Sequence, residues 1–244
     1  MDNVSLLSLS YQLAARRSMD VIANNVANMN TPGYKRESVQ FEQILQQLKP
    51  ADGQSGSQSL SFVKDAGVFR DISAGHVEQT GAPFDLAING SGYFAVQTAQ
   101  GERYTRNGHF TLNADGTIVT EGGDQLMGDG GAITIAPDDG EISFGADGTI
   151  SGKQGQLGKL RLVSFADERA LTKEGESLYS TTQTANAATN VTVSQGMLES
   201  SNVSPVLEIS RMIEVMRSYE ATTSLDKAHA DMARQADQKL ATYQ

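Results

Sequence analysis

The sequence predicts an α+β protein whose N- and C-terminal helices pair as a coiled-coil-like unit, with a central all-β domain between them. Two observations lead to this fold class. Apolar residues recur at helical spacing at both ends of the chain, whereas the middle is rich in glycine and in short strand-like runs. An isolated amphipathic helix has no core of its own, so both terminal stripes need partners. We therefore expect a subunit of an assembly rather than a catalyst.

The first helix is expected over residues 4–29. Thr31 precedes Pro32, and Gly33 follows it, so the helix should end just before these residues. The apolar stripe changes phase at Arg16-Arg17, where it shifts face or changes partner. We expect the two sets of apolar residues on either side of this point to form an assembly interface: Leu6, Leu9 and Leu13, then Met19, Ile22, Val26 and Met29.

Asparagines crowd the end of this helix, at Asn24, Asn25, Asn28 and Asn30. They could mark a frayed C-terminus, because asparagine is a mediocre helix former and a good capping residue. Asn24 and Asn28, however, lie one turn apart on one face. We favour the interpretation that side-chain amides fix contacts between closely packed helices.

The second helix is expected over residues 203–240. Ser204 is a suitable N-cap, Pro205 suits the first turn, and Glu208 places an acid near the positive end of the helix. A helix of roughly 36 residues spans about 54 Å, more than a domain of this size usually covers. The alternative is an ordinary helix packed on its own β domain. If the second helix instead takes part in assembly, the expected interface residues are Val206, Ile209, Ile213 and Met216, then Leu225 and Met232 on a shifted face.

The middle of the chain divides into an arm and a β domain. Residues 34–66 are expected to be an extended arm or linker: 39–48 could be a short helix or an extended segment, and 49–61 is a Ser/Gly/Gln-rich linker. Residues 67–198 follow as an irregular sandwich or barrel. This domain lies between the N-terminal assembly helix, residues 1–33, and the C-terminal assembly helix, residues 199–244. Strands are expected at 85–89, 93–98, 109–113, 118–120, 132–135, 142–144 and 160–165.

An internal sequence similarity predicts two similar hairpins. Residues 110–119 resemble residues 142–151, and both place an Asp-Gly turn between strand-like runs. Two copies are too few for a solenoid, which needs at least three.

Motifs for ligand chemistry are weak. The Gly90-Ser91-Gly92 run formally fits a dinucleotide-binding pattern, but it continues as a strand where that pattern needs a helix. The acidic turn at residues 138–141 lacks the spacing of a calcium loop. His76, His109 and His229 lie apart, without a second ligand at metal-binding spacing. We expect no catalytic, cofactor or metal site.

Composition and charge exclude several kinds of partner and several structural features. The net charge of −10 argues against nucleic acid, and it is concentrated in residues 37–202, so the nearly neutral ends can pack closely. The sequence has no cysteine and no run of 18 apolar residues, so neither disulfides nor a membrane span is expected. A cleaved signal peptide is not expected either, because Arg16-Arg17 interrupt the region where its apolar core would lie.

Several motifs then resemble one family. Residues 20–35 resemble the N-terminal signature of bacterial flagellar rod and hook proteins, and residues 199–203 with 211–221 resemble their C-terminal signature. Between them, residues 88–96, 104–110 and 116–119 resemble the β domain of the same subgroup. The signature residues are Asn24, Asn25, Asn28, Asn30, Thr31, Gly33, Ser201, Asn202, Val203, Tyr219 and Glu220.

The resemblance is strongest to the proximal-rod form, through residues 13–20. It departs from the family at Met216, where relatives often have Gln, and at Thr222-Thr223, where Asn is common. It implies a non-catalytic subunit of the periplasmic basal-body rod, a self-assembling helical tube that transmits torque for motility. Its partners would be other copies of itself, neighbouring rod proteins and the flagellar type III export apparatus. It also implies that the terminal helices order only on assembly.

Two other functions remain open at this stage. One is the distal-rod protein of the same family. The other is a non-catalytic β binding module that uses helical arms to form oligomers. An enzyme with a site in the β domain is the third and weakest possibility.

Overall fold

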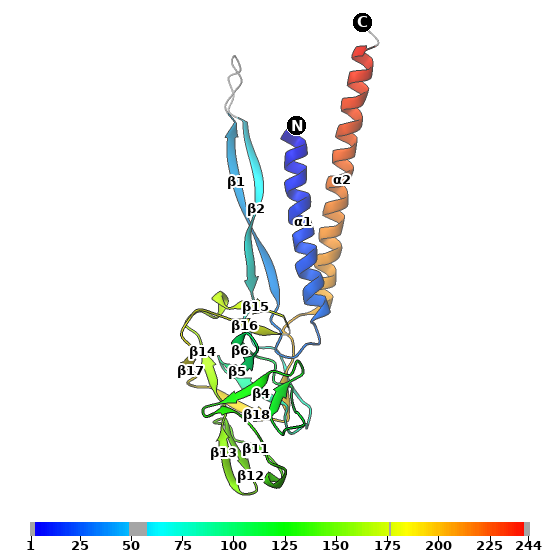
Figure 1. The fold of residues 1–244 in the computed structure, drawn as a ribbon. Helices are drawn as coiled ribbons and strands as arrows, with labels where there is room; N and C mark the ends of the chain where they lie inside the picture. Colours follow the sequence, from blue (N-terminus) through cyan, green and yellow to red (C-terminus); the bar gives the residue numbers. More distant parts are fainter. Residues whose placement is uncertain (1–2, 49–57, 176, 242–244) are drawn as a thin grey trace. The chain divides into compact units, whose positions relative to one another are not determined.

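The computed structural model describes residues 3–48, 58–175 and 177–241. The chain forms two compact units. The helix–hairpin unit comprises residues 1–27, 37–71 and 204–244, and the β unit comprises residues 28–36 and 72–203. Two long terminal helices in contact with each other flank a central antiparallel β region, which confirms the predicted fold class (Figure 1).

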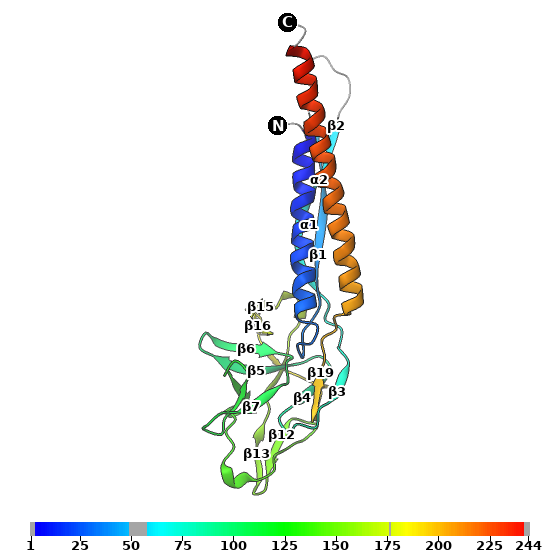
Figure 2. The same ribbon diagram turned by 90° about the vertical axis from the view of Figure 1, so that its right-hand side faces the viewer.

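The helix–hairpin unit is built on two antiparallel helices, α1 (Asn3–Ala27) and α2 (Pro205–Ala241), which lie side by side (Figures 1 and 2). Helix α1 ends at Ala27, two residues before the predicted end, and α2 begins at Pro205, two residues after the predicted start but directly after the expected N-cap Ser204. The unit also holds an antiparallel hairpin of β1 (Glu37–Leu48) and β2 (Gln58–Arg70), and both strands contact α1.

The hairpin decides between the two predictions for residues 39–48, which are strand and not helix. The predicted linker over 49–61 is wrong in its last four residues, because β2 begins at Gln58. Composition suggested a linker there, but pairing with β1 satisfies the backbone hydrogen bonds that a polar segment would otherwise give to water. The rest of that predicted linker, residues 49–57, lies outside the described residues.

The β unit contains short antiparallel strands connected by tight turns. One sheet runs in the order β15-β16-β6-β5-β9-β8-β7, with β10 beside β9 and with β14 beside β5 and β17. Smaller sheets pair β11-β12-β13, β18-β4 and β19-β3. The strands are β3 (Val77–Gln79), β4 (Leu86–Asn89), β5 (Tyr93–Thr98), β6 (Gly101–Thr105), β7 (Phe110–Leu112), β8 (Ile118–Thr120), β9 (Gln125–Gly128), β10 (Gly131–Ala132), β11 (Ser143–Phe144), β12 (Thr149–Gly152), β13 (Gly155–Lys159), β14 (Leu162–Ser164), β15 (Thr172–Glu174), β16 (Leu178–Ser180), β17 (Asn186–Ala187), β18 (Thr192–Gln195) and β19 (Met197–Glu199).

Most expected strands are present, two of them, 93–98 and 118–120, with the predicted bounds. The strand expected at 132–135 is wrong, because β10 stops at Ala132 and the chain then forms only an isolated bridge, between Thr117 and Thr134. Both predicted hairpins are confirmed, as β7–β8 and β11–β12. Their turns place Gly116 and Gly148 at φ +78° and +82°, a left-handed conformation that glycine adopts without steric cost.

The core of the β unit consists of two hydrophobic clusters. The larger one packs Phe94 against Phe110 edge to face, with ring centroids 5.2 Å apart, and surrounds them with aliphatic side chains from most of the sheets. The smaller one gathers the aromatic residues Tyr93, Tyr104 and Phe165 on the other side of β5. The alternation of side chains along β5 thus supplies both clusters.

Burial of tyrosines makes this unit sensitive to alkali. Loss of solvent and the nearby Glu102 carboxylate raise the pKa of Tyr104 to about 12, and burial and Glu168 also raise the pKa of Tyr93. A phenol whose pKa is higher in the folded state contributes its full stabilisation below the unfolded pKa of about 10 and loses it above that value. We therefore expect the unfolding free energy to fall between pH 10 and 12, and to fall less steeply in Tyr104→Phe.

Urea titrations at pH 9, 10, 11 and 12 measure this effect. Tyr11→Phe, which removes an exposed phenol from the helix–hairpin unit, is the matched control. Equal pH slopes in wild type and Tyr104→Phe would contradict the assignment.

Candidate assembly interface

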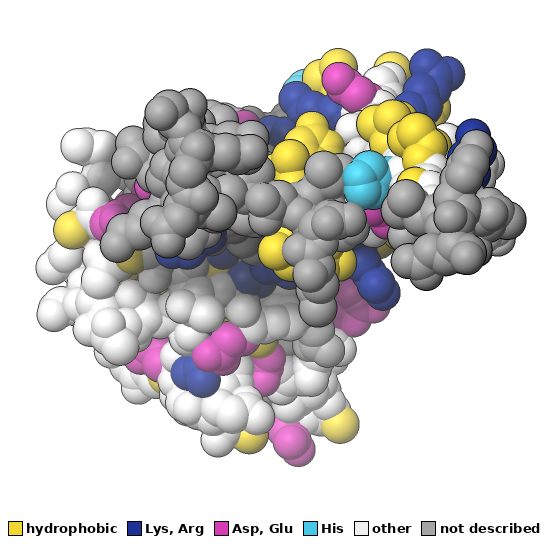
Figure 3. Space-filling model, turned by 90° about the horizontal axis from the view of Figure 1, so that it is seen from above, with side chains coloured by type: hydrophobic (Ala, Val, Ile, Leu, Met, Phe, Trp, Pro, Cys, Tyr) yellow, Lys and Arg dark blue, Asp and Glu magenta, His cyan; other side chains and the backbone are white. Residues whose placement is uncertain are grey.

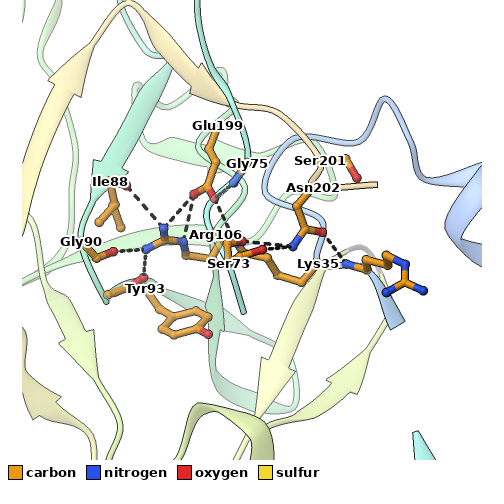
Figure 4. Close-up of polar contacts among 12 residues, drawn as sticks. Lys35, Ser73, Gly75, Ile88, Gly90, Tyr93, Arg106, Glu199, Ser201 and Asn202 are labelled. Atoms are coloured by element: carbon orange, nitrogen blue, oxygen red, sulfur yellow. Dashed lines mark hydrogen bonds and ion pairs between the residues drawn. The ribbon is translucent and has the colours of Figure 1, made fainter. Parts of the chain in front are cut away.

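A buried ionic cluster of Lys35, Arg106 and Glu199 lies inside the β unit (Figure 4). The Lys35 Nζ atom is 2.6 Å from Glu199 Oε1, and Arg106 Nη2 is 2.8 Å from Glu199 Oε2. Their side chains are 4%, 7% and 2% exposed, respectively. Such buried charges persist only when they are paired and hydrogen-bonded. Two cations face one carboxylate, so the remaining donor capacity must find other acceptors.

Backbone oxygens provide those acceptors. Arg106 Nη1 donates to the carbonyls of Gly90 and Gly92 at 2.8 and 2.6 Å, and Lys35 Nζ donates to the carbonyl of Ser73 at 2.8 Å. The Gly90-Ser91-Gly92 turn, which superficially fits a nucleotide motif, therefore serves as an arginine-binding turn. Burial lowers the pKa of Lys35, while the Glu199 carboxylate partly offsets this shift.

Two segments that are far apart in sequence, residues 33–36 and 199–203, meet at this cluster. The Gly33 N–H donates to the Glu199 carbonyl at 2.7 Å, and the Arg36 N–H donates to Asn202 Oδ1 at 2.6 Å. The Asn202 amide also donates to the Ser73 carbonyl at 3.1 Å. Gly33 has φ +69°, and a Cβ atom there would lie 2.3 Å from the Arg106 backbone, so only glycine fits. The β unit thus holds together the segment that follows α1 and the segment that precedes α2.

A second buried polar group ties the elements of the helix–hairpin unit together. Asn25 on α1 and Glu208 on α2 are both almost fully buried, and Asn25 Nδ2 donates to Glu208 Oε2 at 3.0 Å. Asn25 also bonds both backbone groups of Glu37, at 2.7 and 2.9 Å. Arg211 donates to the other carboxylate oxygen of Glu208. One asparagine therefore fixes the register of α1, α2 and β1.

These contacts refine the prediction for the asparagines. Asn25, rather than the pair Asn24 and Asn28, provides the buried amide between the helices. Asn24 is exposed, and Asn28 accepts a hydrogen bond from Thr31 at 3.3 Å. Helical spacing alone did not separate positions 24 and 25, because both are polar and adjacent.

The face of α2 that meets α1 is less apolar than the sequence suggests. Besides the Asn25–Glu208 contact, Ser8 donates to Asp226 at 3.1 Å. From Glu208 to Asp226, half-buried residues of α2 recur every three or four positions, which places them on one face of the helix. That strip consists of Met212, Val215, Tyr219, Thr222, Asp226 and then His229.

The predicted interface residues fall into a buried and an exposed group. Ile22 is buried, and Met19 and Val26 on α1 and Met29 beyond it are half-buried. The others are exposed, and Figure 3 shows hydrophobic side chains at the surface beside acidic and basic ones. The exposed set is Leu6, Leu9, Leu13, Val206, Ile209, Ile213, Met216, Leu225 and Met232.

Most of the signature residues lie at the end of α1 or in the segments that follow α1 and precede α2. Gly33 and Val203 are buried in the β unit, and Thr31, Ser201 and Asn202 are half-buried there. Asn30 is exposed. On α2, Tyr219 belongs to the strip that meets α1, whereas Glu220 is exposed.

The helix–hairpin unit has very little core. Among its described residues, the buried apolar side chains are Ala15, Val21 and Ile22, whereas both hydrophobic clusters belong to the β unit. In the part of the chain that the structure describes, the large hydrophobic side chains that are exposed lie in the helix–hairpin unit, apart from Ile72, Leu112 and Leu157. A surface so rich in exposed apolar residues is typical of an interaction site.

Two other kinds of functional feature, metal sites and membrane-spanning helices, were sought in the described part of the chain. No group of three or more His, Cys, Asp or Glu residues there could hold a metal ion. No described helix is both long and apolar enough to cross a lipid bilayer.

Comparison with known proteins decides the family. Residues 12–35 match the model of flagella basal body rod proteins, residues 87–152 the D1 domain of the flagellar hook proteins FlgE/F/G, and residues 194–239 the C-terminal region of the flagellar basal body rod FlgEFG proteins. The chain is 43% identical to the flagellar basal-body rod protein FlgF of Caulobacter vibrioides, over 98% of both chains. The chain belongs to the family of flagellar basal-body rod proteins.

Other relatives agree with this membership. The FlgF of Mesorhizobium japonicum is 34% identical over 96% of each chain, and the FlgG of Caulobacter vibrioides is 35% identical over 93% of this chain and 95% of its own. The chain is thus a structural subunit of the flagellar basal-body rod and not an enzyme, as the sequence predicts. Membership of the rod family implies assembly with other rod subunits.

The buried ionic cluster was missed by sequence reasoning, although a signal was present. Lys35, Arg106 and Glu199 each lie in a different one of the motifs that resemble the rod family. Two of the motifs contribute a cation and the third contributes an anion, and these opposite charges could have suggested that the three motifs meet.

Proposed function

We propose that the chain is the proximal-rod subunit, which assembles with copies of itself and with neighbouring rod proteins into a helical tube. The observation that carries this proposal is the contrast between the two units. The β unit closes its own core, whereas the helix–hairpin unit leaves most of its large apolar side chains in water. Burying one such side chain contributes about 1.5–3 kcal/mol, so association with other subunits is favourable.

The identities favour the proximal over the distal form. Within one organism, Caulobacter vibrioides, the chain is 43% identical to FlgF and 35% identical to FlgG. The resemblance of residues 13–20 to the proximal-rod form points the same way. The distal-rod protein remains the second candidate because the FlgG relatives also match almost the whole chain.

The remaining parts of the proposal come from the family. A tube of such subunits would cross the periplasm and carry motor torque to the hook. The subunits would reach it unfolded through the flagellar type III apparatus, without cleavage of a signal peptide. The thin core of the helix–hairpin unit suits helices that become fully ordered only on assembly, and that expectation stays a prediction.

A deletion strain tests the assigned position. Cells without this chain should lack flagella and motility, and their isolated basal bodies should stop before the distal rod is built. Expression of the wild-type chain from a plasmid is the control and should restore both. Basal bodies that reach the distal rod without this chain would refute the proximal assignment, and normal flagella would refute the rod function itself.

A further inference from the structure

Two apolar patches lie on the outside of the helix pair, one on each helix. The α1 patch is Leu6, Leu9 and Leu13, and the α2 patch is Val206, Ile209, Ile213 and Met216. All seven side chains are exposed, from 38% for Leu6 to 74% for Val206. Neither patch contains a charged residue.

The patches face away from the contact between the helices. At about 100° per residue, the α1 patch lies nearly half a turn around the helix from Ser8, Ala15 and Ile22, which are on the inner side. The α2 patch lies about a third of a turn from Glu208 and Asp226, which bond to α1. The packing of α1 on α2 therefore leaves both patches uncovered.

The patches also lie at different levels along the helix pair. The two interhelical hydrogen bonds fix the register, since Ser8 is level with Asp226, and Asn25 is level with Glu208. The centre of the α1 patch is therefore level with residues near 225, whereas the α2 patch ends at Met216. At about 1.5 Å per residue, the two centres are about 20 Å apart along the axis. Beyond each patch the same outer strip becomes polar, at Arg16 and Asp20 on α1 and at Glu220 and Lys227 on α2.

We propose that the α1 patch of one copy packs on the α2 patch of the next copy, displaced along the helix axis. This inference rests on the proposed function, and it specifies which surfaces of the chain meet. Two different patches make the contact heterologous, and a heterologous contact generates a ring or an open helical array rather than a closed dimer. The axial offset of about 20 Å favours the open helical array.

The spacing of the side chains supports the pairing. Copies with the same axial direction place α1 of one antiparallel to α2 of the next. When Leu9 is level with Ile213, Leu6 is level with Met216 and Leu13 with Ile209. Spacings of 3 and 4 on α1 match spacings of 3, 4 and 3 on α2, which suits interdigitation of two helices.

Cysteine cross-linking tests this contact directly, because the chain has no cysteine of its own. Leu9→Cys, Ile213→Cys and the double variant are expressed in the deletion strain, and isolated basal bodies are oxidised with copper phenanthroline. The double variant should give dimers and higher multimers on non-reducing gels, and co-expressed single variants should give a dimer of one chain of each kind. Within one chain the two positions are about 18 Å apart along the axis, too far for a disulfide.

A control cysteine pair and a second test pair make the possible results of the cross-linking distinguishable. Leu9→Cys with Glu214→Cys, an exposed neighbour turned away from the patch, should cross-link far less. If the first pair impairs motility, Leu6→Cys with Met216→Cys probes the same contact. Dimers from a single variant alone, a cross-link to a different protein, or no cross-link in motile cells would overturn this inference and leave the rod function standing. A deletion strain with normal flagella would instead refute the rod function.

Discussion

Glu199→Gln should destabilise the β unit by about 3–5 kcal/mol, because it leaves Lys35 and Arg106 buried without their counter-charge. Glutamine keeps the shape of the side chain and can still accept the Gly75 N–H, which donates to Glu199 Oε1 at 2.9 Å. The loss therefore reports the charge and not a cavity. Urea unfolding followed by circular dichroism measures it, since the chain has no tryptophan.

Glu174→Gln is the matched control for this prediction. Glu174 pairs with Arg103 at 2.5 Å in the same unit, but its side chain is 44% exposed. An ion pair in contact with water contributes little, so this substitution should change the unfolding free energy far less. Equal effects of the two substitutions would contradict the role assigned to the buried cluster.

A second substitution tests whether unpaired charge is the cause. Adding Lys35→Met to Glu199→Gln removes one of the two uncompensated cations and should recover part of the lost stability. The deficit of Glu199→Gln should also shrink as the pH rises. Burial lowers the pKa of Lys35 and the Glu199 carboxylate offsets part of that shift, so the pKa should fall further in Glu199→Gln. The unfolded variant then binds more protons than the folded variant over a wider range below about 10.5, and the variant gains more stability than the wild type as the pH rises.

The sequence revealed those parts of the fold that depend on local chemistry. Gly116 and Gly148 follow aspartates in turns that need positive φ, and both hairpins were predicted from these short signals. Pro205 directly after a capping serine located the start of α2. Each of these features is determined by a few neighbouring residues. Predicting them therefore requires no knowledge of which distant segments come into contact.

The parts that were not predicted depend on contacts between distant residues. Lys35 and Glu199 are 164 residues apart in the sequence and Arg106 and Glu199 are 93 apart, and none of the three carries a local signal for burial. Hydrophobicity identified the stripe that starts at Val206 on α2, but the strip that packs on α1 includes Glu208 and Asp226. A polar strip can be buried when each polar group finds a partner, and periodicity contains no information about those partners.

The same distinction supports the proposal that the exposed apolar residues of the helices make contacts between chains. Polar contacts fix the register inside one chain, while the more apolar faces remain available to other chains. An interior contact that depends on paired polar groups has few alternative registers, because a shift leaves buried groups unsatisfied. Apolar faces tolerate more partners, which suits a subunit that must meet several neighbours.

Ile213→Asp should abolish rod incorporation and motility while the purified chain keeps its fold. Ile213 is 46% exposed, so in a single chain the new carboxylate remains in water. In an assembled rod it would be buried without a partner, at a cost of about 3–5 kcal/mol, which weakens association more than a hundredfold. Motility on soft agar and the presence of the chain in isolated basal bodies measure the effect, and circular dichroism of the purified variant checks the fold.

Two comparisons show that this effect would come from the patch and not from an added charge. Ser210→Asp places the same charge at another exposed position on the same helix, outside the α2 patch, and should leave motility intact. Val26→Asp should also prevent incorporation, but Val26 is half-buried, so its charge would disturb the helix pair within each chain as well. Normal motility of Ile213→Asp would mean that this face stays in water in the rod. Loss of motility in Ile213→Asp alone would require the face to be covered by another subunit, because one chain leaves it exposed.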